Sequence, residues 1–127
     1  MNKVDVPDEQ YQIPFGLANI VIEGNDLTIV ALSRMLLIAK EVIYEMTNSN
    51  NYSIELIDPR SVSPIDYETI LSSVKKTGRC VIVHEAPRTS GFGGELSAQV
   101  QELCFYHLEA PIVRVTGWDT PFPHSLE

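Results

Sequence analysis

The sequence has few cysteines and no long hydrophobic run. Cys80 and Cys104 are its only cysteines and stand far apart among apolar neighbours, so neither a disulfide framework nor a cysteine-based metal site is indicated. We expect both to be small core residues of a protein from a reducing compartment. The longest apolar runs, such as residues 35–39, are far too short to cross a bilayer, and no signal or transit peptide is visible. We therefore expect no membrane partner.

Basic residues are also scarce. Nine lysines and arginines stand against 17 aspartates and glutamates, which gives a formal net charge of -8. A surface this negative repels nucleic acid at long range, so nucleic acid is not an expected partner. The excess of acid either keeps the protein soluble or favours a basic partner, and composition alone leaves both readings open. A length of 127 residues suits one domain that buries its own core without metal or disulfide.

The chain alternates short apolar strands with helices after a polar start. Residues 1–12 predict a linker or disordered arm, and residues 13–127 predict one domain. A turn cluster at residues 23–26 predicts a hairpin between the first two strands, which would add one antiparallel edge strand. Strands separated by helices predict an α/β fold, a three-layer α/β/α sandwich with a mostly parallel sheet of about five strands. The expected strands are residues 18–22, 27–31, 54–57, 80–84 and 112–115.

Three helices are expected between these strands. The first covers residues 33–46, and the third follows the glycine-rich loop with Leu96, Val100, Leu103 and Cys104 on one face. The second has the clearest signals. Ser63 as N-cap, Pro64 at the first position and Asp66 closing a capping box predict its start. Its apolar face is predicted by Tyr67, Ile70, Leu71 and Val74. Its end is predicted by two cations in the last turn, Lys75 and Lys76, and by Gly78 as a left-handed cap.

Loops after the carboxyl ends of parallel strands are the natural binding positions in such a sheet. In the first of these loops, Asp58 and Arg60 predict a structural ion pair or an interface contact. In the second, His84 and Glu85 could be an acid/base pair, but neighbours on a strand point to opposite faces, so we expect them to be interface or structural residues. No nucleophile, base and oxyanion hole come together in the sequence. We therefore expect no catalytic, cofactor-binding or metal-ligating residue within this chain.

The second loop continues into Gly91, Gly93 and Gly94. Glycines before a helix let the backbone approach an anion, which would suit a small-anion or nucleotide-binding domain. The spacing is not that of a dinucleotide site, and no lysine completes a phosphate loop. A tight strand-to-helix connection is the simpler interpretation.

Several segments in order resemble the β subunits of 2-oxoacid dehydrogenase E1 components, in their transketolase C-terminal-like domain. The resemblance covers nearly the whole chain from Tyr11, and His84-Glu85-Ala86-Pro87 and the run from Asp119 are more similar to the branched-chain (2-oxoisovalerate) enzymes than to the pyruvate ones. The pentose-phosphate type of transketolase shares the fold and fits these runs less well. The segments that carry the resemblance are residues 11–16, 24–30, 56–66, 74–79, 84–92, 108–115 and 119–124.

The resemblance implies an oxidoreductase that works as an α2β2 heterotetramer. Such an E1 decarboxylates a 2-oxoacid on thiamine diphosphate and Mg²⁺ and passes the acyl group to a lipoyl arm of E2. It implies a cytoplasmic protein in bacteria or archaea, or a mitochondrial matrix protein in eukaryotes. The cofactor of the family lies between the α subunit and the N-terminal domain of β. We therefore expect this fragment to lack that domain, to hold no cofactor and to be inactive alone.

The resemblance also implies what the domain contacts. Its partners would be the α subunit, a second β subunit across a two-fold axis, and the small basic peripheral subunit-binding domain of E2. Glu109 stands where related enzymes keep an acid that contacts E2, so we expect it to be a docking residue. Asp119 is a further possible interface residue. The final helix of the family is expected to be missing, which would weaken E2 docking.

Overall fold

The computed structural model describes residues 7–121, and its elements alternate along the chain. Residues 1–6 and 122–127 lie outside the described part. Half of the arm predicted at 1–12 and the end of the domain predicted at 13–127 are therefore not described. Both of these boundaries stay predictions. The elements are β1 (Asn19–Ile22), β2 (Leu27–Ala31), α1 (Met35–Asn50), β3 (Ile54–Asp58), α2 (Tyr67–Thr77), β4 (Cys80–Pro87), α3 (Phe92–Cys104), η1 (Phe105–His107) and β5 (Val113–Gly117).

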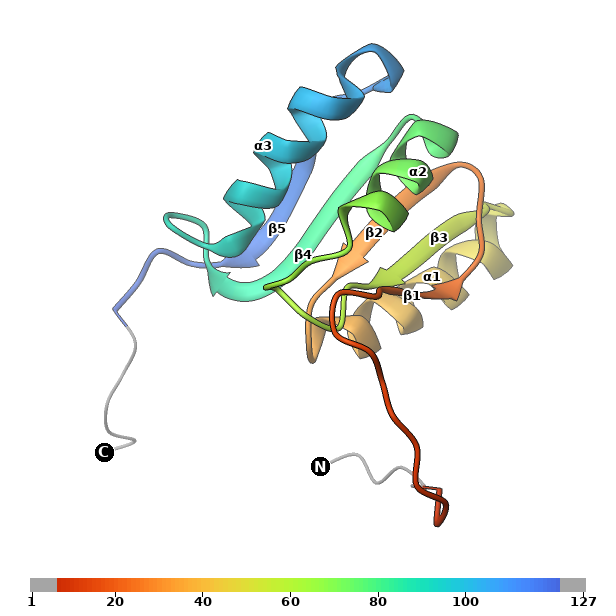
Figure 1. Cartoon of the computed structure of the whole chain (residues 1–127). Helices are drawn as coiled ribbons and strands as arrows, with labels where there is room; N and C mark the ends of the chain where they lie inside the picture. The colour runs from red at the N-terminus through yellow and green to blue at the C-terminus, as the bar shows by residue number, and fades with distance from the viewer. Residues whose placement is uncertain (1–6, 122–127) are drawn as a thin grey trace.

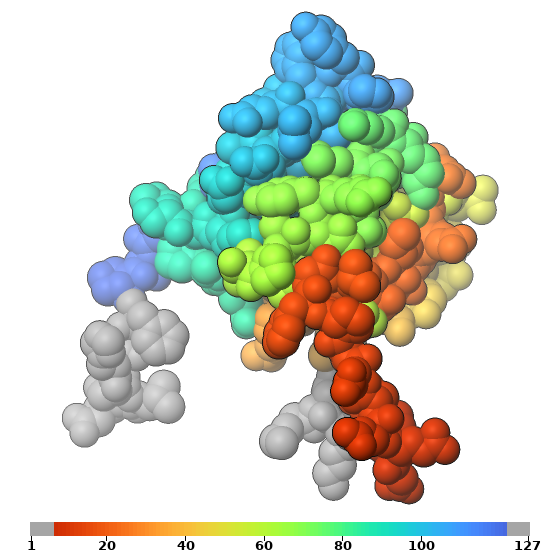
Figure 2. Space-filling model, viewed as in Figure 1, coloured from red at the N-terminus to blue at the C-terminus, as the bar shows by residue number. Residues whose placement is uncertain are grey.

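The five strands form one mixed sheet in the order β1-β3-β2-β4-β5. Only β1 runs antiparallel, beside β3, and the remaining neighbours are parallel. Helix α1 packs on one face of the sheet, while α2 and α3 cover the other (Figure 1). Figure 2 shows α2 and α3 side by side over that second face. The predicted three-layer α/β/α sandwich with one antiparallel edge strand is confirmed.

The predicted hairpin between the first two strands is wrong. β3 lies between β1 and β2, so the turn cluster carries the chain over β3 instead of closing a tight turn. The backbone of Gly24 passes so close to β3 that an added Cβ would lie 2.2 Å from the carbonyl carbon of Ile54. The N–H groups of Asn25 and Asp26 donate to the Ser53 carbonyl, at 2.9 and 2.7 Å. The close crossing therefore requires glycine at position 24.

The predicted start of α2 is also displaced. Its N-cap is Asp66 rather than Ser63, and the peptide bond between Ser63 and Pro64 is cis. The Asp66 carboxylate accepts the N–H of Thr69 at 3.1 Å, as an N-cap does, and the N–H of Ala18 at 3.0 Å. The second bond ties the start of α2 to the segment before β1. The end of the helix at Gly78, with φ of 69°, is as predicted.

Both faces of the sheet bury an apolar core. On one face Ile29, Ala31 and Leu56 pack against Ala39 and Ile43 of α1. On the other, the sheet meets α2 and α3 through Val30, Ile57, Ile70, Val74, Cys80, Ile82, Leu96, Val100 and Cys104.

Both cysteines are core residues, as predicted. They are buried free thiols, and burial raises the pKa of Cys80 to about 12. The predicted apolar face of α3 holds for three of its four members. Leu103 is the exception, because it is 52% exposed.

A polar group lies inside the second core, where the sequence indicated only an apolar strand. Glu55 is 1% exposed and pairs with Lys76 of α2, and it accepts the Gly24 N–H at 3.3 Å. Next to it the hydroxyl of Thr28 contacts those of Ser73 and Thr77 at 2.6 and 2.7 Å. These contacts fix α2 on the sheet with directional bonds in addition to apolar packing.

The ionisation of Glu55 depends on these partners. Burial raises the pKa of its carboxyl, but hydrogen bonds from Lys76, Ser73 and Gly24 and the charge of Lys76 outweigh burial, so the pKa lies below its ordinary value. A folded-state pKa below the unfolded value means that the carboxylate stabilises the fold above about pH 4.5 and loses this contribution as the pH falls.

We expect Lys76→Met to lower the free energy of unfolding at pH 7 by about 1–3 kcal/mol, because it leaves a buried carboxylate without its cation. Lys75→Met is the matched control, since Lys75 is exposed and forms no ion pair within residues 7–121. Urea unfolding measured at pH 7 and again at pH 3.5 should show that the difference between Lys76→Met and the unchanged chain narrows in acid. An equal loss in both lysine variants would contradict the assigned role of Lys76.

Candidate functional site

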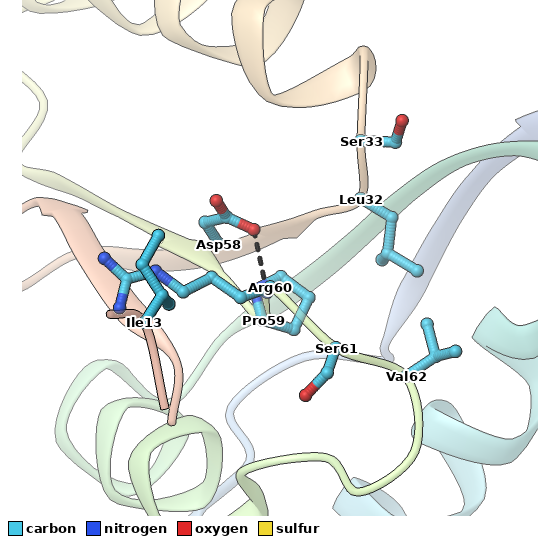
Figure 3. Close-up of a pocket in the computed structure, with 8 residues that line it drawn as sticks. All are labelled: Ile13, Leu32, Ser33, Asp58, Pro59, Arg60, Ser61 and Val62. Carbon is cyan, nitrogen blue, oxygen red and sulfur yellow. Dashed lines mark hydrogen bonds between the residues drawn. The ribbon is translucent and has the colours of Figure 1, made fainter. Parts of the chain in front are cut away.

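One functional candidate is a cavity at the carboxyl ends of β2 and β3. The chain leaves β2 toward α1 on one face of the sheet and leaves β3 toward α2 on the other, which opens a crevice between the two connections. This cavity, of about 510 Å³, is shown in Figure 3. It is lined by Ile13, Leu32, Ser33, Asp58, Pro59, Arg60, Ser61 and Val62.

Asp58 and Arg60 meet in this cavity, but not through their charges. Asp58 Oδ1 accepts the backbone N–H of Arg60 at 2.9 Å. Figure 3 shows the Arg60 side chain extended past Ile13, away from the carboxylate. Within the described residues the two side chains form no ion pair. The carboxylate instead fixes a turn in which Arg60 has a φ of 57°.

The hydroxyl of Ser61 in this cavity is engaged by backbone groups. The Ser61 hydroxyl accepts the Gly16 N–H at 3.2 Å and donates to the Pro64 carbonyl at 2.5 Å, so no base activates it. Ser33 lines the same cavity with a φ of 55°. Two non-glycine residues with positive φ at one cavity are the kind of backbone strain that folds keep at functional positions. Ser33 was missed as a site residue, although it stands only two residues after a predicted strand, near the position that singles out Asp58.

His84 and Glu85 are separated by the sheet. His84 is 4% exposed on the α3 side, whereas the Glu85 side chain is exposed. His84 Nε2 accepts the N–H of Gly93 at 3.2 Å. Because Nε2 is the acceptor, the neutral ring carries its proton on Nδ1, which has no partner among the residues described. His84 therefore supports the start of α3 and does not form an acid/base pair with Glu85.

The glycine-rich segment is part of α3 and not an open loop. The helix starts at Phe92, and the Gly94 N–H donates to the Gly91 carbonyl at 2.9 Å. With the Gly93 N–H on His84, two of the backbone donors that an anion would need are already used. Added Cβ atoms at Gly91 and Gly93 would lie 2.8 and 2.4 Å from the His84 ring. These glycines serve close packing against His84, which favours the interpretation as a tight strand-to-helix connection.

Asp119 joins the two segments that follow β4 and β5. Its carboxylate accepts the N–H of Thr89 at 2.9 Å and the Thr89 hydroxyl at 2.8 Å. These two hydrogen bonds hold the pKa of the Asp119 carboxyl below its ordinary value. Asp119 thus has a structural contact within the chain.

Glu109 lies at the opposite edge of the sheet, near the start of β4. Its backbone N–H donates to the Gly78 carbonyl at 2.8 Å, and its carboxylate lies 2.8 Å from the Arg79 guanidinium. Both side chains are largely in solvent, with exposures of 61% for Glu109 and 50% for Arg79. The acid predicted to dock E2 is therefore accessible, and its present partner is an exposed arginine.

Two further features bear on function. Between residues 7 and 121, no three histidine, cysteine, aspartate or glutamate side chains are placed to hold a metal ion. No helix in that range has the length and apolar content needed to cross a bilayer.

Comparison with known proteins assigns the domain to a family. The family described as transketolase, C-terminal domain, matches residues 16–127. The chain belongs to this family. A split-gene transketolase solved as an inactive β4 tetramer is similar to this domain with a TM-score of 0.71 and 29% identity, over 94% of this chain and 37% of the solved one.

The curated relatives of this chain include β subunits of the family that the sequence resembles. The chain is 54% identical to the 2-oxoisovalerate dehydrogenase subunit beta of Pseudomonas aeruginosa over 96% of its own length and 34% of the relative. It is 50% identical to the mitochondrial 2-oxoisovalerate dehydrogenase subunit beta of Dictyostelium discoideum over 97% of its length and 33% of the relative. The predicted likeness to branched-chain E1 β subunits is confirmed, and the chain spans about a third of their length.

We expect Gly93→Ala to destabilise the domain by about 1–3 kcal/mol, because its Cβ would overlap a buried histidine ring in a core that cannot expand. Gly94→Ala is the matched control in the same turn. Its Cβ would meet only the end of the Arg114 side chain at 3.4 Å, and alanine favours the helix by about 0.5–1 kcal/mol. Urea unfolding of both variants checks the difference.

The double variant His84→Ala with Gly93→Ala isolates the cause. In the His84→Ala background the ring is absent, so Gly93→Ala should lower the free energy of unfolding by less than it does in the unchanged chain. Fully additive losses would show that the overlap with His84 is not what excludes a side chain at position 93.

Proposed function

We propose that the chain is the assembly and E2-docking domain of the β subunit of a thiamine-diphosphate-dependent branched-chain 2-oxoacid dehydrogenase E1. The whole enzyme would oxidatively decarboxylate a 2-oxoacid and transfer the acyl group to the lipoyl group of E2. The family assignment and the similarity to two 2-oxoisovalerate dehydrogenase β subunits support this function.

One structural observation carries the assembly role: an uncovered apolar part of the sheet. β5 pairs in parallel with β4, and Val113 and Val115 stand beside Val81 and Val83. Paired residues of neighbouring strands point to the same face, which here is the face of α1. Val113 and Val115 are nevertheless 51% and 50% exposed. Half-exposed valines on a sheet face indicate a surface that a partner covers.

The solvent-facing side of α1, on the same face of the sheet, is also apolar. Leu37, Ile38 and Val42 are 45%, 45% and 44% exposed on α1, the one helix that packs on that face within residues 7–121. The solved relative is described as a β4 tetramer, which is consistent with contacts between copies of this domain type. We propose that a second β subunit covers the Val113–Val115 face and that an α subunit completes the heterotetramer.

The proposed cofactor does not fit the residues described here. Thiamine diphosphate binds through Mg²⁺ and its diphosphate, and the described residues offer no cluster of three potential metal ligands. Asp58 is the only carboxylate in the cavity at the ends of β2 and β3. We therefore assign the cofactor to the rest of the enzyme and derive no step of the reaction through this domain.

We expect the variant Val113→Asp with Val115→Asp to prevent association between β subunits, since two carboxylates would have to be desolvated in the contact. In the β subunit coexpressed with its α subunit, sedimentation should show a shift from heterotetramer to smaller species. Leu103→Asp is the control, because Leu103 is equally exposed, at 52%, on the other face. An intact tetramer in the valine variant would reject this face as the contact.

We propose Glu109 as the residue of this domain that docks E2. An exposed carboxylate beside one arginine can exchange that partner for a cation of a basic docking module, and such rim charges mainly set the association rate. Glu109→Gln in the assembled E1 should weaken binding to the E2 subunit-binding domain about three- to tenfold at low salt, and less at high salt.

Two further variants separate docking from general charge. Arg79→Gln frees the Glu109 carboxylate and should leave binding equal or tighter. Glu68→Gln, at the exposed start of α2 on the other face of the sheet, removes the same charge elsewhere and should change binding little. Calorimetric titration of all three variants measures the effect. Equal weakening by Glu68→Gln and Glu109→Gln would leave Glu109 without a specific role.

A further inference from the structure

A second cavity opens where the segment after β4 meets the segment after β5. These two segments lie side by side at the end of the sheet, beyond the pairing of Pro87 with Gly117 (Figure 1). The cavity has a volume of about 640 Å³. It is lined by Arg88, Arg114, Val115, Thr116, Gly117, Trp118, Asp119 and Thr120.

Two guanidinium groups in this cavity each donate a hydrogen bond to the backbone carbonyl of the other arginine. Arg88 Nη1 donates to the Arg114 carbonyl at 3.3 Å, and Arg114 Nη1 donates to the Arg88 carbonyl at 3.4 Å. A guanidinium has five N–H donors, so each arginine uses only a small part of its capacity in these hydrogen bonds. The two hydrogen bonds fix both side chains in one region and leave most of their donors for another acceptor.

Neither guanidinium forms an ion pair within residues 7–121. This is unusual in a chain of net charge -8, where acids outnumber bases 17 to 9. The one acid that lines the cavity is Asp119, and both of its carboxylate oxygens accept hydrogen bonds from Thr89. Asp119 holds the segment after β5 and keeps its negative charge, so two arginines and one carboxylate line the cavity and leave a net positive charge.

The start of α3 lies beside this cavity. An added Cβ on Gly94 would lie 3.4 Å from Arg114 Nη1, so the guanidinium lies across the first turn of that helix. The positive end of the helix dipole favours an anion and Glu95 in the same turn opposes one, so the attraction comes from the two arginines. Gly94 also leaves room for the arginine, which a side chain at that position would reduce.

We propose that this cavity binds the phosphate group of a small molecule between the guanidinium groups of Arg88 and Arg114. A phosphate offers several acceptor oxygens and two negative charges, which match two forked cations better than the single charge of a carboxylate. Trp118 lines the same cavity and is 87% exposed, so its indole ring lies next to the bound group. Val115 lines this cavity and also belongs to the face proposed for the second β subunit, so phosphate binding is tested on the chain without its partner subunits.

The chain carries its own reporter for the test. Trp118 is the only tryptophan, so fluorescence of the whole 127-residue chain, excited selectively at tryptophan and not at its five tyrosines, reports on this cavity. Titration with inorganic phosphate at constant ionic strength should change the fluorescence along a saturable curve. Arg88→Gln and Arg114→Gln should each weaken the binding about tenfold or more, as expected when a hydrogen-bonded charge is removed.

Controls distinguish a site from general charge and from unfolding. Arg79→Gln, at the opposite edge of the sheet, should leave the phosphate affinity unchanged. Arg114→Lys keeps the charge without the planar fork and should bind between the unchanged chain and Arg114→Gln, which keeps the test valid if the glutamine variant folds poorly. A linear response that chloride reproduces, or equal affinity in Arg79→Gln and both glutamine variants, would overturn the proposal.

Discussion

The central place of β2, between β3 and β4, is the constraint on which the rest of this structure depends. From β2 the chain moves by way of α1 to one side of the sheet, and from β3 it returns by way of α2 across the opposite face to β4. The two connections separate at the carboxyl ends of β2 and β3, and the cavity of Asp58 and Arg60 lies there as a consequence. Placing β3 beside β2 also forces the early turn to cross β3, which requires the bare backbone of Gly24.

The same topology distributes the helices unevenly. Two helices cover one face and a single helix covers the other, so α1 cannot shield the whole width of a five-stranded sheet. The valines of β5 on the α1 side stay half exposed because no further segment between residues 7 and 121 reaches them. The fold thus leaves an apolar surface as a direct result of its connection order, and burial of such a surface drives association between subunits.

Sequence patterns predicted what depends on neighbours along the chain and failed where distant segments decide. The apolar spacing of α2 and its end at Gly78 follow from contacts within one helix, and both are as expected. The hairpin failed because a turn cluster does not determine which strand becomes the neighbour. The start of α2 was displaced because Asp66 also binds the Ala18 N–H, 48 residues away. Glu55 was hidden in an apolar strand because its partner, Lys76, lies on another element.

Candidate sites follow the same division. Glu109 and Asp58 could be named from motif and strand end, since each stands out in its own segment. The pair of Arg88 and Arg114 could not, because 26 residues separate them and only the pairing of β4 with β5 brings them together. The proposed docking acid lies at the amino edge of the sheet, and both cavities lie at the carboxyl edge. Because the sheet separates these edges, a partner on Glu109 leaves the arginine cavity open, and the two roles can operate in one domain at the same time.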